Sequence, residues 1–411
     1  MCAEDGSRYS ECACTPSSGG AGGSANDAGN GGSGGTGAVG AGGIGGSGGI
    51  GGTGGVGGSG ASGGTGGQGG SGGLAGAAGI GGTGSGGTGG VSGSGGGGGT
   101  SSCGVYNLGY KVVDAEYSKA LDRIVTISAG PDTLHIFNPA TKTEVTVPLI
   151  LPPLAVSVGP NGAQAAVGYD GYLSLVDLTT GTIQKTLGVT AETGDILLAG
   201  NGFAYVFPEW DQWVKVHSID LNTGAETLTQ SIYAKAHVAL DPSGLYFYSA
   251  DPLSLGTIEK WEIQYGAAQY LYDNITKGFK ACNDIWMSET GDRIFSRCGN
   301  VFKSSAVKAD DMTYNGSLGI KVRHVSHSAA AHKVYAIGDS SLGTSDLDVH
   351  VFEDTFLAEQ PVIPLPCFKD SPVVTSSHGR FVFPSSTGSE VFVIVEGDAL
   401  GAPGAFGFAK L

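Results

Sequence analysis

Short segments in which apolar and polar residues alternate recur through most of the sequence. The clearest covers residues 167–187, where the alternation runs from Leu173 to Asp177. Turn-forming residues stand on either side of it, at 169–171 and 179–181. Strict alternation indicates a strand with one buried face, and glycine beside small polar residues is typical of a tight antiparallel hairpin. A single hairpin is not stable in water, so the segment needs neighbours of the same kind.

Two families of turns repeat along the chain. The first comes before an apolar–x–apolar strand, at residues 159–162, 241–244, 289–292, 327–332 and 377–379. The second follows about 20 residues later, at residues 138–141, 178–181, 221–224, 265–267, 308–311, 353–355 and 396–398. Starts in the second family are separated by 40, 43, 44, 43, 45 and 43 residues. Seven units of this length, each with two strand–turn–strand pairs, predict an all-β fold, a seven-bladed β-propeller over residues 103–411.

The half-repeats resemble those of YVTN-type and WD-like propellers of bacterial surface proteins. The likeness lies in VHSIDLNTGAE (residues 216–226) and SLVDLTTGTI (174–183), with LDPSGLYFY (240–248) as the matching first half. The sequence has no literal YVTN string and no consistent WD dipeptide. The resemblance implies the fold and says little about the function.

The first quarter of the chain has a different composition. Most of the 77 glycines lie between residues 19 and 99, where Gly-Gly-X triplets repeat without proline. Nothing there is regular or large enough for an ordinary core, so we expect a disordered tether over residues 19–102. A bundle of glycine-rich extended helices is the alternative.

Residues 1–18 are short, polar and rich in cysteine. Cys2, followed by small and acidic residues and a long glycine tract, resembles the mature end of a bacterial lipoprotein, in which the cysteine carries the lipid. This implies an anchor segment and a place in the cell envelope, on the outer surface or secreted, with membrane contact only through the lipid. The alternative is that Cys2 is an ordinary residue after a misassigned start.

Charge limits the partners. Residues 103–411 contain 20 Lys and Arg against 33 Asp and Glu, a net charge of −13. This argues against a nucleic acid or an anionic membrane surface as partner. We expect a monomer that binds a protein or a carbohydrate, although an acidic surface also serves solubility alone.

Four cysteines are candidates for disulfides. Cys282 and Cys298 flank the turn at 289–292, so they fall near one another on adjacent antiparallel strands. Cys103 opens the predicted propeller and Cys367 comes before its last unit, so ring closure could bring them together. Two buried free thiols are the alternative for Cys282 and Cys298.

No catalytic motif stands out: GxSxG, HExxH and a Walker loop are all absent. His324 and His327 fall on opposite faces of a strand, which is poor for a shared metal. We therefore expect no metal and no cofactor.

Binding residues are expected on one mouth of the ring, in loops between second and third strands and between blades. Aromatic residues between carboxylates suit a sugar ring or a cationic group. The candidates are Tyr169, Asp170, Glu209, Trp210, Asp211, Trp213, Asp251, Asp339 and Asp346. The alternative is that Trp210 and Trp213 pack between blades.

The sequence thus favours a tethered, non-catalytic module for binding or display. A propeller enzyme, a lyase or hydrolase acting at the channel mouth, and a structural spacer without ligand are the alternatives. Resemblance to streptogramin lyases, which use a histidine and a metal near the axis, implies four channel positions: His237, Asp284, His324 and Thr375.

Overall fold

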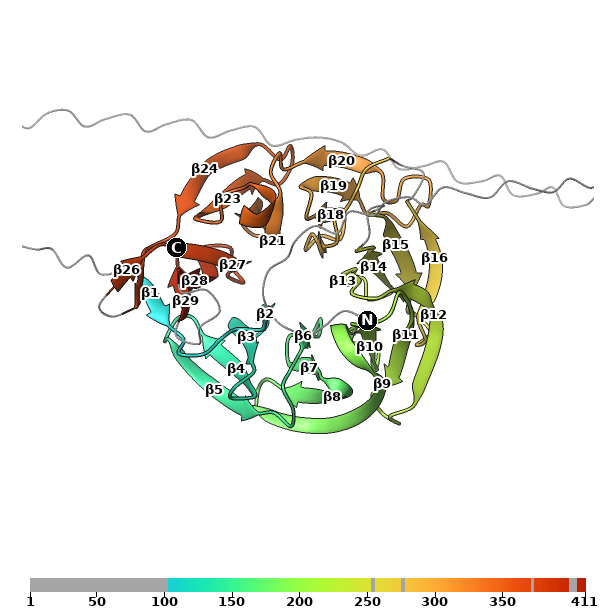
Figure 1. Ribbon diagram of the computed structural model, residues 1–411. Coiled ribbons are helices and arrows are strands. Elements are labelled where there is room, and N and C mark those ends of the chain that lie inside the picture. Colours follow the sequence, from blue (N-terminus) through green and yellow to red (C-terminus); the bar gives the residue numbers. More distant parts are fainter. Residues whose placement is uncertain (1–102, 253–255, 275–277, 371–372, 399–404) are drawn as a thin grey trace, which may run out of the picture. The chain divides into compact units, whose positions relative to one another are not determined.

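The computed structural model describes residues 103–252, 256–274, 278–370, 373–398 and 405–411. The predicted anchor (1–18), the tether (19–102) and the proposed lipidation at Cys2 lie outside these residues. The regular secondary structure of the described residues is almost entirely β-strand, and η2 (Ser340–Leu342) is a short 3₁₀ helix. Their sheets stand around a ring, and β2, β6, β13, β21 and β27 lie nearest the centre (Figure 1). The chain is a β-propeller.

Five sheets have four antiparallel strands each. Four of them run in chain order from the centre outwards, and the first consists of β2 (Asp114–Ser118), β3 (Arg123–Ser128), β4 (Thr133–Asn138) and β5 (Thr143–Pro148). The second consists of β13 (His237–Leu240), β14 (Tyr246–Ala250), β15 (Ile258–Glu262) and β16 (Gln269–Asp273), and the third of β17 (Ile285–Met287), β18 (Arg293–Ser296), β19 (Asn300–Lys303) and β20 (Tyr314–Ser317). The fourth consists of β21 (Val322–Ser328), β22 (Lys333–Gly338), β23 (Asp348–Glu353) and β24 (Glu359–Pro364).

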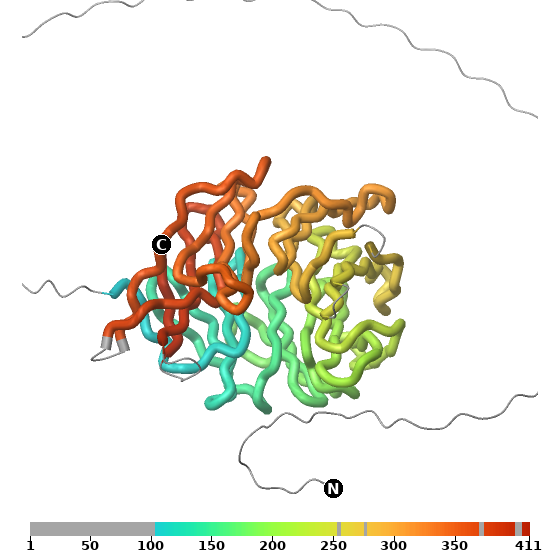
Figure 2. The backbone as a smooth tube through the Cα atoms, turned by 45° about the horizontal axis from the view of Figure 1, so that its top comes forward, coloured from blue at the N-terminus to red at the C-terminus, as the bar shows by residue number. Residues whose placement is uncertain are grey.

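The fifth four-stranded sheet closes the ring. It combines β27 (Ser377–Pro384), β28 (Val391–Gly397) and β29 (Phe406–Lys410) with β1 (Val105–Asn107) from the other end of the domain. Val105 pairs with Ala409 in this sheet. The two ends of the domain therefore share one sheet, and the first and last strands lie side by side (Figures 1 and 2).

One sheet has seven strands, in place of two separate sheets of four. It consists of β6 (Ala155–Val158), β7 (Gln164–Gly168), β8 (Asp170–Asp177), β9 (Thr182–Leu198), β10 (Phe203–Pro208), β11 (Trp213–Asp220) and β12 (Glu226–Tyr233). The 17-residue β9 pairs first with β8 and then, over its last residues, with β10. No turn interrupts it, so the strands on both sides of β9 belong to one continuous sheet.

Turn chemistry explains the hairpins. At 178–181, the Asp177 carboxylate accepts hydrogen bonds from the N–H groups of Thr179 and Thr180, at 2.8 and 3.0 Å. Gly181 has a φ of 67°, which a glycine adopts without steric cost. Asp220, Asn222 and Thr223 repeat the arrangement one unit later. These contacts confirm the predicted turns between the third and fourth strands of the two units.

The last repeat was assigned wrongly. Residues 377–379 lie inside β27, and residues 396–398 end β28 instead of following a third strand. An extra hairpin of β25 (Phe368–Asp370) and β26 (Val373–Thr375) forms a separate two-stranded sheet before β27, and the fourth strand comes from residues 105–107. The sequence pattern was therefore displaced by one strand here.

The core of the described residues consists of seven clusters between facing sheets. Val125, Leu134 and Ile136 of one unit, for example, pack on Val167 and Val176 of the next. Six similar clusters follow around the ring. Each unit buries both faces against its neighbours, as a propeller requires. No helix of the described residues is long and apolar enough to cross a membrane.

Candidate functional site

Carboxylates at the start of the innermost strands join neighbouring units. Asp114 of β2 accepts from its own neighbour Ala115 N–H and from Val156 N–H of β6, at 2.8 and 2.9 Å. Asp195 of β9 accepts in the same way from Ile196 N–H and from Val238 N–H of β13, at 2.8 and 3.0 Å. Both oxygens of each carboxylate are thus fixed by backbone donors at one end of the central channel.

His237 stands between the carboxylate of Asp195 and that of Asp284, the residue just before β17. Its Nδ1 lies 3.8 Å from Asp195 Oδ2 and 3.9 Å from Asp284 Oδ1. The charge of Asp284 is the main cause that raises the pKa of His237, against the effect of burial, and Asp195 and Asp114 add to it. Of the four channel positions named from the sequence, the structure brings His237 and Asp284 together, and it adds Asp114 and Asp195, which the sequence missed.

The acids of this cluster hold protons more strongly than usual. Burial raises the pKa of Asp114 to about 6 and that of Asp195 to about 7, although His237 lowers both. Glu116 of β2 is exposed, yet burial by the surrounding strands and the charges of Asp114 and Asp195 raise its pKa to about 8. Glu116, Asp114 and Asp195 are therefore one group of electrostatically coupled acids.

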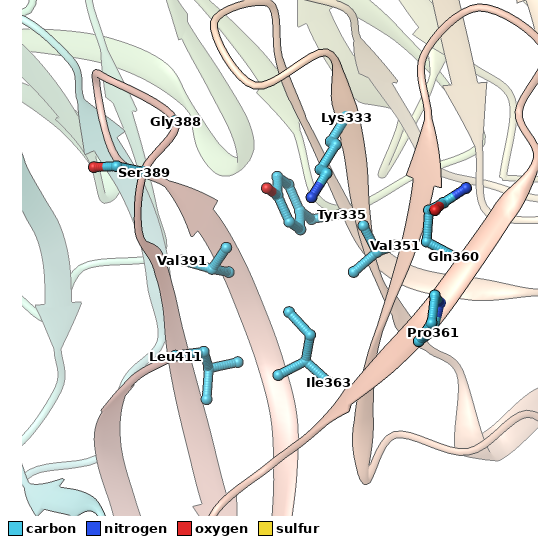
Figure 3. A pocket seen from close by; sticks show the side chains of 10 residues that line it. All are labelled: Lys333, Tyr335, Val351, Gln360, Pro361, Ile363, Gly388, Ser389, Val391 and Leu411. Atoms are coloured by element: carbon cyan, nitrogen blue, oxygen red, sulfur yellow. The ribbon is translucent and has the colours of Figure 1, made fainter. Parts of the chain in front are cut away.

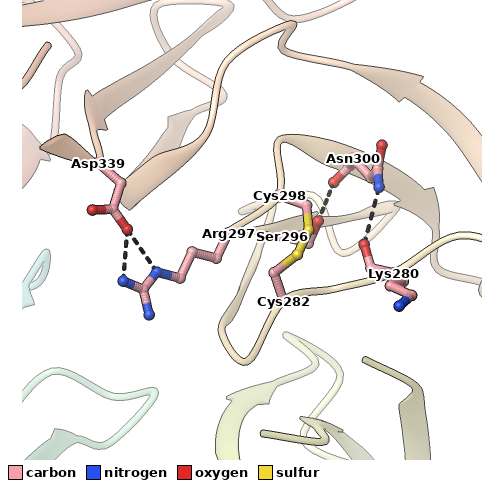
Figure 4. Close-up of a disulfide and its surroundings, with 7 residues drawn as sticks. All are labelled: Lys280, Cys282, Ser296, Arg297, Cys298, Asn300 and Asp339. Carbon is pink, nitrogen blue, oxygen red and sulfur yellow. Dashed lines mark hydrogen bonds and ion pairs between the residues drawn. A yellow bond between two sulfur atoms is a disulfide. The ribbon is translucent and has the colours of Figure 1, made fainter. Parts of the chain in front are cut away.

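Arg297 lies on the same side of the ring and is neutralised by Asp339. Its Nη2 and Nε lie 2.6 and 2.8 Å from Asp339 Oδ2 (Figure 4). Burial raises the pKa of Asp339, but the hydrogen bonds from Ser341 and Arg297 outweigh this and keep the pKa low. The neighbouring disulfide between Cys282 and Cys298 ties the loop before β17 to the loop after β18.

The opposite end of the channel is crossed by an ion pair. Lys119 in the turn after β2 contacts Glu289 in the turn between β17 and β18. The Glu289 carboxylate also accepts a hydrogen bond from the Ala329 N–H, and the backbone N–H of Glu289 donates to His327 Nδ1. The end at Asp114 and His237, called the mouth here, carries no such bridge among the described contacts.

The mouth continues into an exposed aromatic surface over β8–β12. Trp210 and Trp213 are 61% and 55% exposed. The Trp210 indole N–H donates to Glu192 Oε2 at 2.5 Å, and Lys235 Nζ lies 4.5 Å from the ring centroid. We call Asp170, Glu192, Glu209, Trp210, Asp211, Trp213 and Lys235 the aromatic rim.

Contacts along the rim connect two neighbouring units. Asp170 is the register partner of Glu192, which binds the Trp210 indole. Lys235 Nζ lies 2.6 Å from Glu209 Oε1, and its backbone N–H donates to Pro208. The rim therefore gathers the exposed members of the predicted binding set, together with Glu192 and Lys235, which the sequence missed. Neither has a motif that could have identified it.

Four predicted binding residues are buried, and this corrects their assignment. Tyr169 is fully buried in the cluster formed with Val125 and its neighbours. Asp251, Asp339 and Asp346 are 5%, 0% and 5% exposed. Asp339 binds Arg297, and Asp346 Oδ1 lies 3.0 Å from His378 Nδ1. The carboxylates of Asp339 and Asp346 are thus already bound by side chains of the protein itself.

The other two channel candidates lie outside the His237 cluster, although His324 is on an innermost strand, β21. His324 is surrounded by the rings of Trp286, Phe381 and Phe383, and its Nδ1 accepts from Val382 N–H. Burial lowers its pKa to about 3, so it is neutral. Thr375 lies on β26, outside the propeller units. In the described part of the chain, no three His, Cys, Asp or Glu residues are arranged to hold a metal ion.

A pocket of about 350 Å³ lies between β22–β24 and β28, away from the mouth. Figure 3 shows Lys333, Gln360 and Ser389 around it, with Val351 and Val391 below. Most of its apolar residues belong to the cluster between these two sheets. The pocket is therefore a gap in the hydrophobic packing between these two sheets.

Comparisons with known proteins support the fold alone. The sequence matches no protein-family model, and no curated protein is significantly similar to it. The structure resembles the crystal structure of the β-propeller domain of Cps50 (Swd1) from Myceliophteria thermophila, with a TM-score of 0.55. The two are 12% identical, over 74% of this chain and 97% of that one. At this identity the similarity defines the class, a β-propeller, and carries no ligand or activity across.

Proposed function

We propose that the propeller has seven blades, with β6–β8 and the first part of β9 as one blade and the rest of β9 with β10–β12 as the next. The packing supports this count. Leu173 and Leu175 of the first half share a buried cluster with Ile196, Leu198 and Val206 of the second. Two halves of one flat sheet would not face each other in this way.

We propose further that this propeller is a non-catalytic binding module and that the aromatic rim is its ligand surface. The observation that carries the proposal is the exposure of both Trp210 and Trp213 among carboxylates at the mouth. Exposed indoles provide large, rigid contact surfaces, and aromatic residues are enriched where proteins bind ligands. Core packing does not account for either side chain.

The envelope location remains part of the proposal. The structure contains both predicted disulfides, Cys103–Cys367 and Cys282–Cys298, and disulfides are consistent with an extracellular location. Attachment through a lipid on Cys2 and a glycine tether rests on the sequence alone.

The test is an unbiased array of glycans, basic peptides and acidic peptides. It is probed with the full chain and with a Trp210→Ala/Trp213→Ala variant. A matched control replaces Tyr265 and Phe356, which are 78% and 87% exposed in turns at the other ends of the strands. Binding that the rim variant loses and the control keeps supports the proposal. If no probe binds in this pattern, the rim is not a ligand surface, and the spacer hypothesis stands.

A hydrolase or lyase at the mouth is the second candidate. The observation that favours it is Glu116, whose pKa of about 8 keeps it protonated at neutral pH beside Asp114. A protonated acid next to a carboxylate is a pairing used in general acid–base catalysis. Loss of turnover in Glu116→Gln, measured on any glycan or peptide that the array identifies, would support this candidate.

A further inference from the structure

We infer that the aromatic rim binds a primary ammonium or guanidinium group and that Lys235 occupies this position as an internal substitute for the ligand. The inference rests on the proposed binding role of the rim and names its ligand class. It starts from the contacts of Lys235, which are those a bound cation would make.

Lys235 places its ammonium group between an indole and a carboxylate. Nζ lies 4.5 Å from the Trp210 ring centroid and 2.6 Å from Glu209 Oε1. A cation over an aromatic face and beside an acid is a recurrent mode of ammonium recognition. The molecule thus shows that the rim accepts a cation at this point.

The backbone presents Lys235 in a particular conformation. Its φ is 62°, in the left-handed region that residues other than glycine and asparagine rarely adopt. The hydrogen bond from its N–H to Pro208 C=O fixes the loop beside the Trp210 loop. The side chain is thereby directed over the indole, although no core contact requires it there.

The substitute is held weakly enough to be displaced. The Lys235 side chain is 49% exposed, and exposed ion pairs contribute little because water and salt screen them. Trp210 itself is held independently of Lys235, through its indole N–H bond to Glu192. When Lys235 moves away, the indole keeps its orientation and its face becomes available.

Charge favours a cation over a neutral sugar. Asp170, Glu192, Glu209 and Asp211 provide four carboxylates in the rim, against the single positive charge of Lys235. The domain as a whole carries a net charge of −13, counted over residues 103–411. Both fields attract a basic ligand and raise its rate of association.

The experiment measures binding of fluorescein-labelled hexalysine to the full chain by anisotropy. Lys235→Met keeps the aliphatic stem and removes the competing ammonium group. A cation–π contact at an exposed site corresponds to about 2- to 5-fold in affinity, so the variant should bind hexalysine more tightly by that factor. Lys215→Met is the matched control, because Lys215 is an exposed lysine of the same unit that bonds only Ser231 among the described contacts. It changes the net charge equally and leaves the rim intact, so its affinity should stay within about twofold of wild type.

Further arms identify the ligand class. Adding Trp210→Leu to Lys235→Met should remove the gain, and spermine should compete with hexalysine if any ammonium source suffices. Equal affinities for Lys235→Met and Lys215→Met, or a gain that persists without Trp210, would overturn the inference. Trp210-dependent binding of maltohexaose or cellohexaose without hexalysine binding would overturn the cation class and leave the proposed function intact. Absence of Trp210-dependent binding for every probe would remove both.

Discussion

At the scale of single residues, environment separates carboxylates that look alike in the sequence. Asp177 caps an exposed turn, and hydrogen bonds from Thr180 and Thr179 lower its pKa. Asp339 is buried and kept ionised by hydrogen bonds from Ser341 and Arg297. Glu116, in the channel with acidic neighbours, has a pKa of about 8. A carboxyl group can therefore cap a turn, form an ion pair or stay protonated at neutral pH, depending on its neighbours.

The raised pKa of Glu116 predicts a dependence of stability on pH. Its pKa is 4.5 when unperturbed and about 8 in the folded protein, so the folded state binds more protons within this range. The contribution of Glu116 to stability is therefore lost as the pH rises through this window. Wild type should become less stable relative to Glu116→Gln between about pH 5 and about pH 8, as measured by urea unfolding.

The buried histidines do not obscure this comparison. Burial lowers the pKa of His135 to about 4 and that of His324 to about 3, which has the opposite effect on the pH profile. Both histidines are present in wild type and variant, so their effects cancel in the difference. A difference that does not change with pH would contradict the desolvated channel.

Trp210 and Trp213 give a second prediction at this scale. Because Trp210 is 61% exposed, Trp210→Ala should change the free energy of unfolding by no more than about 0.5 kcal/mol. Trp213 packs on Tyr233 with ring centroids 3.9 Å apart, so its replacement should cost up to about 1 kcal/mol. Trp261→Ala is the control, since Trp261 is fully buried and should cost about 3–5 kcal/mol. Thermal and urea denaturation separate these cases, and a loss of about 3 kcal/mol at Trp210 would rule out a surface role.

At the scale of elements, a covalently closed loop fixes the position of the short strand β17. β17 has three residues and follows a loop in which Cys282 and Asn283 have φ values of 61° and 81°. Such left-handed residues are unfavourable unless the surroundings hold them. The Cys282–Cys298 disulfide and the bond from Cys298 N–H to Ala281 C=O do so. The loop in turn positions Asp284 at the mouth.

Removing this disulfide should have a local and moderate effect. With a sequence separation of 16, chain entropy predicts that Cys282→Ala/Cys298→Ala lowers the free energy of unfolding by about 3 kcal/mol. Thiol labelling of the denatured, unreduced wild type should leave both cysteines unmodified. Complete labelling of either would show that the bond does not form, and would weaken the extracellular assignment.

At the scale of the whole molecule, the ring is closed by residues from both ends of the domain. β1 pairs with β29, and Cys103 just before β1 is bonded to Cys367 in the connection that leads to β27. Closure covers the edge that the last three strands would otherwise expose. The Cys103–Cys367 bond thus holds β1, which is far in sequence from the other three strands of this sheet, β27, β28 and β29.

The closing disulfide should therefore contribute more than the local one. Its sequence separation is 264, for which chain entropy gives about 5 kcal/mol. Cys103→Ala/Cys367→Ala should lower the urea midpoint more than Cys282→Ala/Cys298→Ala does. Equal midpoints for the two double variants would indicate that strand pairing alone closes the ring.

The sequence by itself determined the local features. Alternation, turn residues and a period near 43 predicted the strands, most of the turns and the propeller class, because these depend on residues close together in the chain. The Cys282–Cys298 disulfide followed from the strand register around a local turn, and the Cys103–Cys367 disulfide followed from the expected closure of the ring. His237 and Asp284, two of the four channel positions named from the sequence, lie near one another because each stands at the start of an innermost strand.

Only the tertiary structure decided how distant residues meet. The burial of Tyr169, Asp251, Asp339 and Asp346 depends on partners in other strands and loops, so equal positions in the repeat did not imply equal exposure. The 17-residue β9 has no turn where the repeat predicts one, and an extra hairpin, β25–β26, precedes β27. No residue pattern in the sequence marked either departure from the repeat. The contacts of Trp210 with Glu192 and Lys235 join residues up to 25 positions apart through the curvature of the ring. Such contacts are set by the packing of whole units, which local periodicity does not encode.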